Sequence, residues 1–305
     1  MEDIVTEARA LTESGVREIV LIAQDSANYG LDRYKKPMLP TLLRELAKIE
    51  KLAWIRVLYS YPKYFTDELI DVFANEPKVV KYVDLPLQHA HNAVLRSMNR
   101  PDTREGVEKL IHKLRDRIPG VTIRSTFIVG FPGETDEDFE ATMDVVREAR
   151  FSAAYTFQYS KRPGTPAAEM KNQVAHETVR ERYERLVELV GRIAWEENRR
   201  FEGQEVEVMF ALGEGRKDSA TNRMSGRARD NRLVHVAVGE EPSDRPRPGD
   251  IAYATITHAA PHHLNSDAPL RGLRRTRGGD AWEAANTDVP EPKGVPLGMP
   301  SLRRP

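Results

Sequence analysis

The residues best placed to bind a ligand lie in the stretch Ile128-Val-Gly-Phe-Pro-Gly-Glu134. Residues 122–129 are largely β-branched or apolar and contain no turn former, which predicts a buried strand. Gly130 and Gly133 then flank an apolar pair, and glycine both accepts a positive φ and lets a ligand approach the main chain closely. The pattern predicts either a ligand site at the end of a strand or an ordinary turn between a strand and a helix.

Polar residues also collect at the ends of the other predicted strands. These residues are Gln24 and Asp25, Ser60, Gln88 and His89, and Gln158 to Ser160. In a parallel barrel all these strand ends lie on one rim, which is the rim where barrel enzymes carry out their chemistry. A doubly wound sheet would scatter them, so the pattern favours a barrel.

Strands and helices alternate along the first 200 residues. The predicted strands cover residues 16–23, 53–60, 79–87, 122–129 and 153–159, and the predicted helices cover residues 2–14, 38–51, 66–75, 93–98, 103–117, 136–150 and 176–200. Thr66 and Thr135 are expected N-caps, and Asp138 can complete an acidic capping box with Thr135. Strands that recur at roughly 30-residue intervals predict parallel βα units, although the strand expected before the first helix is missing.

Composition limits the classes of protein that fit. The chain has 305 residues, 40% of them hydrophobic and 30% charged, and its formal net charge is −1. No run approaches the roughly 18 apolar residues of a membrane span, and the N-terminus lacks a signal-peptide layout. We therefore expect a cytoplasmic protein with no membrane partner, in which any nucleic-acid surface is local.

The pattern changes after about residue 200. Short alternating strands are predicted at residues 205–211, 233–238 and 251–258, as in the small antiparallel barrels that commonly bind nucleic acid. Residues 213–232 between them are predicted to be a loop with six basic and three acidic residues, either an RNA contact or a solvated loop. From residue 264 to 305 the composition predicts a disordered tail.

Several motifs in order resemble one known family. They are Leu21-Ile-Ala-Gln-Asp25, Leu85-Pro-Leu-Gln-His89, Ile128-Val-Gly-Phe-Pro-Gly-Glu-Thr135, Tyr159-Ser-Lys-Arg-Pro-Gly-Thr-Pro166, and Gly215-Arg-Lys-Asp218 with Gly226-Arg227. Residues 1–200 resemble the core of the radical S-adenosylmethionine (SAM) methylthiotransferases, and residues 201–263 resemble their TRAM domain. The resemblance implies an α/β fold, with a partial TIM-type barrel of parallel strands and outer helices, followed by a small antiparallel, OB-like β-barrel.

The same resemblance implies a reaction and its cofactors. The family attaches a methylthio group to an unactivated carbon, using one 4Fe-4S cluster to cleave SAM to a radical and a second 4Fe-4S cluster as a sulfur relay. This chain has no cysteine, whereas cluster iron needs thiolate ligands. In the family those cysteines precede the helix with which this chain begins. We therefore expect no catalytic residue, no metal ligand and no activity in this chain alone, because it is either truncated or a degenerate, RNA-binding paralogue.

The resemblance also assigns roles to matching residues. Those implied to bind SAM are Gln24, Asp25, Gln88, Gly130, Phe131, Pro132, Gly133 and Glu134. The glycine turn would border the adenine, and Gln24 with Asp25 would hold the amino-acid portion, unless Gln24 only satisfies loop amides. Glu134 would either contact the ribose or cap the following helix.

A second set is implied to contact substrate or RNA. It consists of His89, Arg162, Thr165, Arg216, Lys217 and Arg227. His89 would touch the substrate or be structural, and Arg162 with Thr165 would close the mouth or form a rigid Pro-Gly turn. A metal hydrolase is disfavoured, because it needs clustered ligands at strand ends and the pair His262-His263 lies outside the barrel.

Two branches of the family differ in substrate. Residues 54–135 resemble the branch that modifies an aspartate of a small-subunit ribosomal protein, and residues 147–282 resemble the branch that modifies isopentenyl-adenosine beside the tRNA anticodon. The local positive charge of residues 213–232 favours a polyanion over a basic protein. The expected partner is thus the tRNA anticodon stem-loop, with the ribosomal protein as the alternative.

Overall fold

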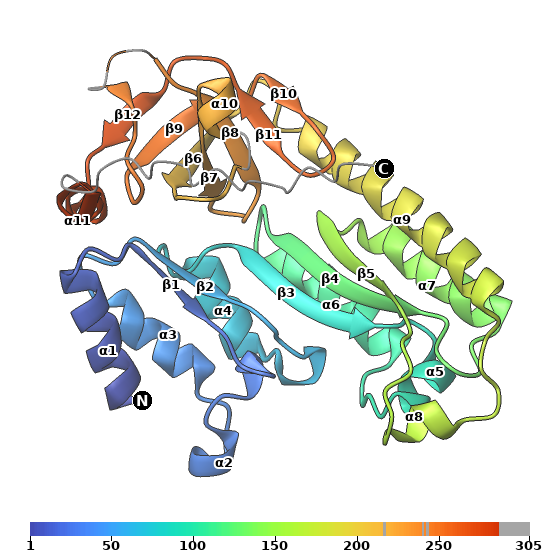
Figure 1. The fold of residues 1–305 in the computed structure, drawn as a ribbon. Helices are drawn as coiled ribbons and strands as arrows, with labels where there is room; N and C mark the ends of the chain where they lie inside the picture. Colours follow the sequence, from blue (N-terminus) through green and yellow to red (C-terminus); the bar gives the residue numbers. More distant parts are fainter. Residues whose placement is uncertain (216–217, 240, 242–243, 287–305) are drawn as a thin grey trace, which may run out of the picture.

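The computed structural model describes residues 1–215, 218–239, 241 and 244–286 (Figure 1). Its first part consists of α1 (Glu2–Glu13), β1 (Glu18–Leu21), α2 (Leu31–Tyr34), α3 (Leu39–Ala47), β2 (Trp54–Val57), α4 (Asp67–Asn75), β3 (Tyr82–Gln88), α5 (Asn92–Ser97), α6 (Arg104–Arg117), β4 (Thr122–Val129), α7 (Asp136–Ala149), β5 (Ala153–Gln158), α8 (Pro166–Glu169) and α9 (His176–Arg199). The predicted alternation of helices and strands is confirmed. The predicted boundaries are right to within a few residues.

The five strands lie side by side in chain order and are all parallel. β1 pairs with β2, and β3, β4 and β5 form a second ladder. A parallel bridge between Ile55 and Val79 connects the two ladders, and Ser60 N donates to Asp84 O at 3.0 Å. Within the described part of the chain, β1 and β5 are edge strands. The predicted partial barrel is confirmed.

Side chains alternate between the two faces of these strands. Along β4, Ile123, Phe127 and Val129 are buried in the core that the strands share with the helices. Arg124 points to the other face, which we call the inner face. There it donates to Asp84 at 2.9 and 2.6 Å and lies over the Tyr155 ring at 4.8 Å. The pleat of the strand, with its period of two, produces this division.

A β domain follows α9. It contains β6 (Glu205–Phe210), α10 (Asp218–Thr221), β7 (Arg223–Ala228), β8 (Leu233–Ala237), β9 (Ile251–Thr255), β10 (His258–Ala259), β11 (Leu264–Ser266) and β12 (Arg271–Arg274), and α11 (Arg277–Asn286) comes last. The mostly antiparallel sheet has the order β10-β11-β8-β7-β6-β9-β12. Its apolar side chains form a core of their own, so the predicted small antiparallel domain is confirmed.

The prediction of a loop over residues 213–232 is wrong. β7 lies inside that stretch and pairs with both β6 and β8. The charge pattern did not indicate this strand, because β7 contains Arg223 and Arg227. Gly226 is a sign of the strand pairing, because a Cβ at this position would lie 2.3 Å from Met209 O on the neighbouring strand β6.

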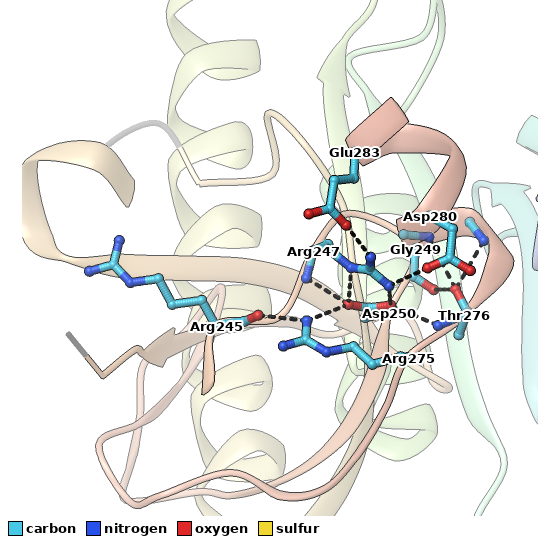
Figure 2. Close-up of polar contacts among 10 residues, drawn as sticks. Arg245, Arg247, Gly249, Asp250, Arg275, Thr276, Asp280 and Glu283 are labelled. Atoms are coloured by element: carbon cyan, nitrogen blue, oxygen red, sulfur yellow. Dashed lines mark hydrogen bonds and ion pairs between the residues drawn. The ribbon is translucent and has the colours of Figure 1, made fainter. Parts of the chain in front are cut away.

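The prediction of a disordered tail from residue 264 is wrong for residues 264–286. β11 and β12 extend the sheet, and Figure 2 shows how the start of α11 is held. The buried Asp250 carboxylate accepts hydrogen bonds from Arg247, from Arg275 Nη1 at 2.9 Å and from Thr276 N at 2.9 Å. Charge pairing around Asp250 thus holds the start of α11, while Leu264, Leu270 and Leu273 of the same segment pack into the core of the β domain. Residues 287–305 lie outside the described residues.

The β domain packs against the N-terminal ends of the parallel strands. Its Met209 and Ile251 share an apolar cluster with Trp54 and Tyr82, the first residues of β2 and β3. Arg232 Nη1 donates to Thr122 Oγ1, at the start of β4, at 3.2 Å. The described residues of the β domain therefore leave the opposite rim, where the strands end, uncovered.

Candidate active site at the C-terminal ends of the strands

The glycine turn after β4 has the expected conformation. Gly130 and Gly133 have φ of +76° and +85°. A Cβ on Gly130 would lie 2.4 Å from Val179 Cγ2, and a Cβ on Gly133 would lie 2.4 Å from Asn172 Nδ2. The glycines are thus required both by backbone conformation and by close packing against the segment that leads into α9.

Glu134 holds this turn from within. Its buried carboxylate accepts the Gly130 N–H at 3.1 and 3.0 Å and the Arg182 Nη1–H at 2.7 Å. Both expected roles of Glu134, ribose contact and helix cap, are therefore corrected, because the side chain is fully enclosed. The cap belongs to Thr135 and Asp138, whose predicted capping box is present.

His89 belongs to the same buried network. Its Nδ1 accepts the backbone N–H of His91 at 3.0 Å, so Nε2 carries the proton and donates to Glu134 Oε2 at 3.2 Å. The side chain is 1% exposed. The geometry therefore supports the structural alternative for His89 and leaves it no route to a substrate.

A cavity of about 600 Å³ lies at the ends of β3, β4 and β5, within the size range of small-molecule sites. It is lined by Gln88, Met98, Arg100, Thr126, Ile128, Phe131, Phe157, Gln158, Tyr159, Ser160, Arg162, Thr165 and Ala167. Gln88, Phe131, Arg162 and Thr165 among them were predicted from the sequence. The other predicted residues of the turn do not line the cavity but lie behind Phe131 and hold it in position; they are Gly130, Pro132, Gly133 and Glu134.

One wall of this cavity is aromatic. Phe131 and Tyr159 meet edge to face with ring centroids 5.4 Å apart, and Phe157 is 52% exposed. A half-exposed phenylalanine at a cavity offers a stacking surface for a planar ligand. Adenine, whether in SAM or in RNA, has that shape.

Gln24 and Asp25 lie at the end of β1, outside this lining. Gln24 is exposed, whereas Asp25 Oδ1 accepts the Tyr61 N–H at 3.1 Å. Burial, with a smaller contribution from the charge of Asp102, raises the pKa of Asp25. Arg100 lies over the Tyr61 ring at 4.6 Å and also lines the cavity. Asp25 is therefore connected to the cavity through Tyr61 and Arg100.

Arg100 and Arg182 were not predicted as site residues from the sequence. Backbone strain marks the same rim: Tyr59, Gln88 and Asn99 are non-glycine residues with φ of +57°, +71° and +57°. Such residues cost about 1–3 kcal/mol each and gather at functional sites. No motif could have shown this, because φ is set by the fold.

Of the three predicted RNA contacts in the β domain, the one that the structure describes is paired. Arg227 forms an ion pair with Glu214 at 2.8 Å; Arg216 and Lys217 lie outside the described residues. The other described arginines of residues 213–232 are also paired: Arg223 with Asp267, Arg229 with Glu207, and Arg232 with Asp230. The charges of these four described arginines are thus compensated.

The residues present do not fit an iron–sulfur cluster. The sequence contains no cysteine, and the described residues contain no group of three or more His, Asp or Glu arranged to hold a metal ion. The aromatic wall of the cavity, in contrast, fits an adenosyl group. No described helix has the length and apolar character to cross a membrane.

The chain is similar to a set of curated bacterial proteins. A tRNA-2-methylthio-N(6)-dimethylallyladenosine synthase of Thermobifida fusca is 49% identical over 303 residues, which is 99% of this chain and 61% of that protein. Proteins of the same name from Streptomyces coelicolor and Cutibacterium acnes are each 48% identical, over 98% of this chain and 59% and 60% of their own lengths. The chain thus spans 59–61% of these relatives.

Residues 1–146 match the Radical SAM superfamily. Among solved structures, the coproporphyrinogen III oxidase of Escherichia coli, a radical SAM enzyme, superposes on 62% of this chain with 16% identity and a TM-score of 0.45. The family match and the identity to these relatives together support the radical SAM methylthiotransferase family for this chain.

Proposed function

We propose that this chain is the SAM- and RNA-binding part of a cytoplasmic enzyme that methylthiolates isopentenyl-adenosine next to the tRNA anticodon. The cavity beside the glycine turn carries the proposal, because it joins an aromatic wall to the motif that the family uses for SAM. The names of relatives that are 48–49% identical along almost the whole chain supply the substrate.

In this proposal the chain's own residues bind and orient. Phe131, Phe157 and Tyr159 provide the aromatic surface for the adenosyl group, and the turn that Glu134 holds keeps Phe131 in that surface. Gln88 lines the same cavity and is suited to a ribose hydroxyl, while Asp25 faces the amino-acid end of SAM. Radical formation needs thiolate-bound iron that these residues cannot supply.

Modification of a ribosomal-protein aspartate is the alternative. The charge of residues 213–232 argues less strongly against it than the sequence suggested, since the described arginines there are paired. The relatives' names favour tRNA. An RNA-binding paralogue without catalysis is favoured by one observation, the absence of cysteine.

A chimera tests the substrate. The N-terminal, cluster-bearing segment of the Thermobifida fusca relative would be fused ahead of this chain and expressed in a strain lacking both methylthiotransferases. Mass spectrometry should find the methylthiolated nucleoside in tRNA. A modified ribosomal aspartate with unmodified tRNA would refute the tRNA assignment. The same chimera with its cluster cysteines replaced by alanine is the control for radical chemistry.

We also propose RNA contact through the β domain, which corresponds by resemblance to a TRAM domain. Replacing Arg216, Lys217 and Arg227 together by alanine should weaken binding of an anticodon stem-loop and flatten its dependence on salt. Arg271→Ala is a suitable control, because Arg271 is 76% exposed on the last strand of the same sheet. Unchanged affinity in the triple variant would remove this surface from the RNA interface.

A further inference from the structure

A second cavity lies at the rim opposite to the candidate active site, where β4 and β5 begin. It has a volume of about 480 Å³ and lies between the turns that precede these two strands, the end of α9 and the β domain. None of the site residues predicted from the sequence lines it. The cavity is therefore separate from the site on which the proposed function rests.

Four arginines from four separate segments enter the lining of this cavity. They are Arg115 of α6, Arg150 after α7, Arg200 at the end of α9 and Arg232 of the β domain. The lining itself contains one carboxylate, Glu197. Two further carboxylates, Glu196 and Asp230, pair with these arginines from outside the lining. The four guanidinium groups thus outnumber their carboxylate partners by one.

Glu197 neutralises two of these arginines at once. Its Oε1 accepts from Arg150 Nε at 2.7 Å, and its Oε2 accepts from Arg200 Nη1 at 2.8 Å. Both carboxylate oxygens are therefore directed at guanidinium groups. Each guanidinium has five N–H donors, so Arg150 and Arg200 keep donors with which to bind a ligand.

Arg115 is the arginine without a carboxylate partner. Its Nη2 donates to the backbone oxygen of Ala149, and among the described residues it forms no ion pair. Burial of its guanidinium, together with the charges of Arg150 and Arg200, lowers the pKa of Arg115. The charge of Glu197 opposes this shift only in part. An anion bound in the cavity would relieve the repulsion among these cations.

Arg150 stands at a position that glycine would occupy with less strain. It is the C-cap of α7 and has a left-handed backbone conformation, with φ of +43° and ψ of +60°. From this position its guanidinium reaches α9 and the cavity. The side chain, rather than the backbone, accounts for an arginine at this cap.

The arrangement is suited to a phosphate group. Guanidinium groups that converge from separate segments can each donate to a different oxygen of one phosphate, which offers more acceptor oxygens than a carboxylate does. Arg232 is held at the edge of the cavity by the ring of Phe201, whose centroid lies 4.3 Å away and which also lines the cavity. The guanidinium plane is thus set before a ligand arrives.

We propose that this arginine cavity, lined by Arg115, Arg150, Arg200 and Arg232, binds a phosphate group. Two sources can supply it, a backbone phosphate of an RNA and a free phosphate compound. The RNA source rests on the proposed function, whereas the phosphate site itself does not.

The experiment uses the full chain and two probes, an anticodon stem-loop RNA and inorganic pyrophosphate. Fluorescence anisotropy over a series of salt concentrations measures RNA binding, and calorimetry measures pyrophosphate binding. The variant that carries both Arg115→Gln and Arg200→Gln is compared with the wild type. If the phosphate belongs to RNA, the affinity for RNA should fall about tenfold, and the slope of log affinity against log salt should become shallower by about one. If the phosphate is free, the affinity for pyrophosphate should fall by about tenfold or more, with RNA binding unchanged.

A matched control removes the same charge from the same two helices. It carries Lys113→Gln and Arg199→Gln; Lys113 pairs with Asp67, and Arg199 lies 5.4 Å from the centroid of the Trp195 ring. Neither residue lines the cavity, so the control should bind both probes as the wild type does. A loss as large as that of the test variant would reduce the effect to net charge and overturn the proposal.

Glu197→Gln separates recognition from folding. This change removes the single carboxylate of the lining and frees Arg150 and Arg200, so the recognised probe should bind several-fold more tightly. A variant that fails to fold cannot gain affinity, so a gain supports the site directly. Weaker binding of that probe to folded Glu197→Gln would overturn the proposal.

Two further results would overturn it. One is the absence of binding of both probes to the wild type, and the other is equal affinity of the wild type and the variant at Arg115 and Arg200. None of these measurements involves SAM or methylthiolation. The chimera can therefore fail while the phosphate site stands, and the site can fail while the chimera modifies tRNA.

Discussion

Arg182 Nη1 lies 2.7 Å from Glu134 Oε1, although the two residues are 48 positions apart in the chain. The pair ties α9 to the turn after β4, and both side chains are buried, with exposures of 6% and 0%. The same guanidinium also reaches Asp136, whose side chain is 86% exposed. One cation therefore serves a buried partner and an exposed one, which allows the two pairings to be compared.

Glu134→Gln should destabilise the chain far more than Asp136→Asn. The first change leaves Arg182 buried without its enclosed carboxylate, which typically costs about 3–5 kcal/mol. The second removes an exposed pairing that is worth about 0–1 kcal/mol. Urea denaturation of both variants measures the difference, and equal free energies of unfolding would contradict the role given to Glu134.

Gly130→Ala should be more costly than Gly120→Ala. Both glycines have positive φ, +76° and +78°, so both changes carry the backbone penalty of roughly 1–2 kcal/mol. A Cβ at Gly130 also meets Val179, whereas a Cβ at Gly120 meets nothing within 4 Å. Thermal melts should show a lower Tm for Gly130→Ala than for Gly120→Ala, and this difference in Tm should become smaller when both changes are made in a Val179→Ala background. An unchanged difference in Tm in the Val179→Ala background would rule out the clash with Val179 as its cause.

In Asp250→Asn, the free energy of unfolding should decrease less on acidification than it does in the wild type. Burial tends to raise the pKa of Asp250, but hydrogen bonds from Arg247, Thr276 and Arg275 prevail and lower it below 3.8. A carboxyl whose folded pKa is lowered stabilises the fold above its ordinary pKa, and this stabilisation is lost as pH falls through the folded value.

Stability of the wild type should therefore fall below pH 3.8 with a slope that Asp250→Asn reduces. The variant should also be less stable at neutral pH, by about 1–3 kcal/mol. Denaturation between pH 2 and 7 checks both points. Asp280→Asn is the matched control, because Asp280 contacts the same Arg247 but is 65% exposed (Figure 2). Identical pH profiles of all three proteins would contradict the prediction.

Arg232→Ala should loosen the β domain from the barrel. Arg232 Nε donates to Asn198 Oδ1 at 2.7 Å, and the guanidinium lies 4.3 Å from the Phe201 ring centroid. Losing these contacts should cost about 1–3 kcal/mol, seen as faster proteolytic cleavage after α9. The control Arg271→Ala removes only an exposed pairing. Cleavage at the wild-type rate would show that Arg232 does not secure this junction.

Incubation of the chain with iron and sulfide under reducing conditions should give no stoichiometric iron and no cleavage of SAM to 5′-deoxyadenosine. The reason is chemical, since cubane clusters in this family need thiolates and the sequence has none. Iron analysis and the visible absorbance measure the outcome. A cubane spectrum with bound iron would be the opposite result.

The sequence by itself determined the succession of strands and helices along the first 200 residues, the glycine turn, and the capping box of Thr135 with Asp138. Each of these depends on residues close together in the chain, so local periodicity and turn chemistry are sufficient to predict them. The absence of cysteine excluded cluster ligands in the same direct way.

Only the tertiary structure decided what the polar residues do. Glu134 was predicted to face a ligand or a helix, but Arg182 and His89, distant in sequence, enclose it. Arg100 gained its place in the cavity from the strained turn at Asn99 and from the Tyr61 ring. The start of α11 is held in place because Asp250 gathers Arg247, Arg275 and Thr276 around one buried carboxylate. Long-range charge pairing leaves no periodic trace in a sequence, and burial then fixes which of the available partners each charge takes.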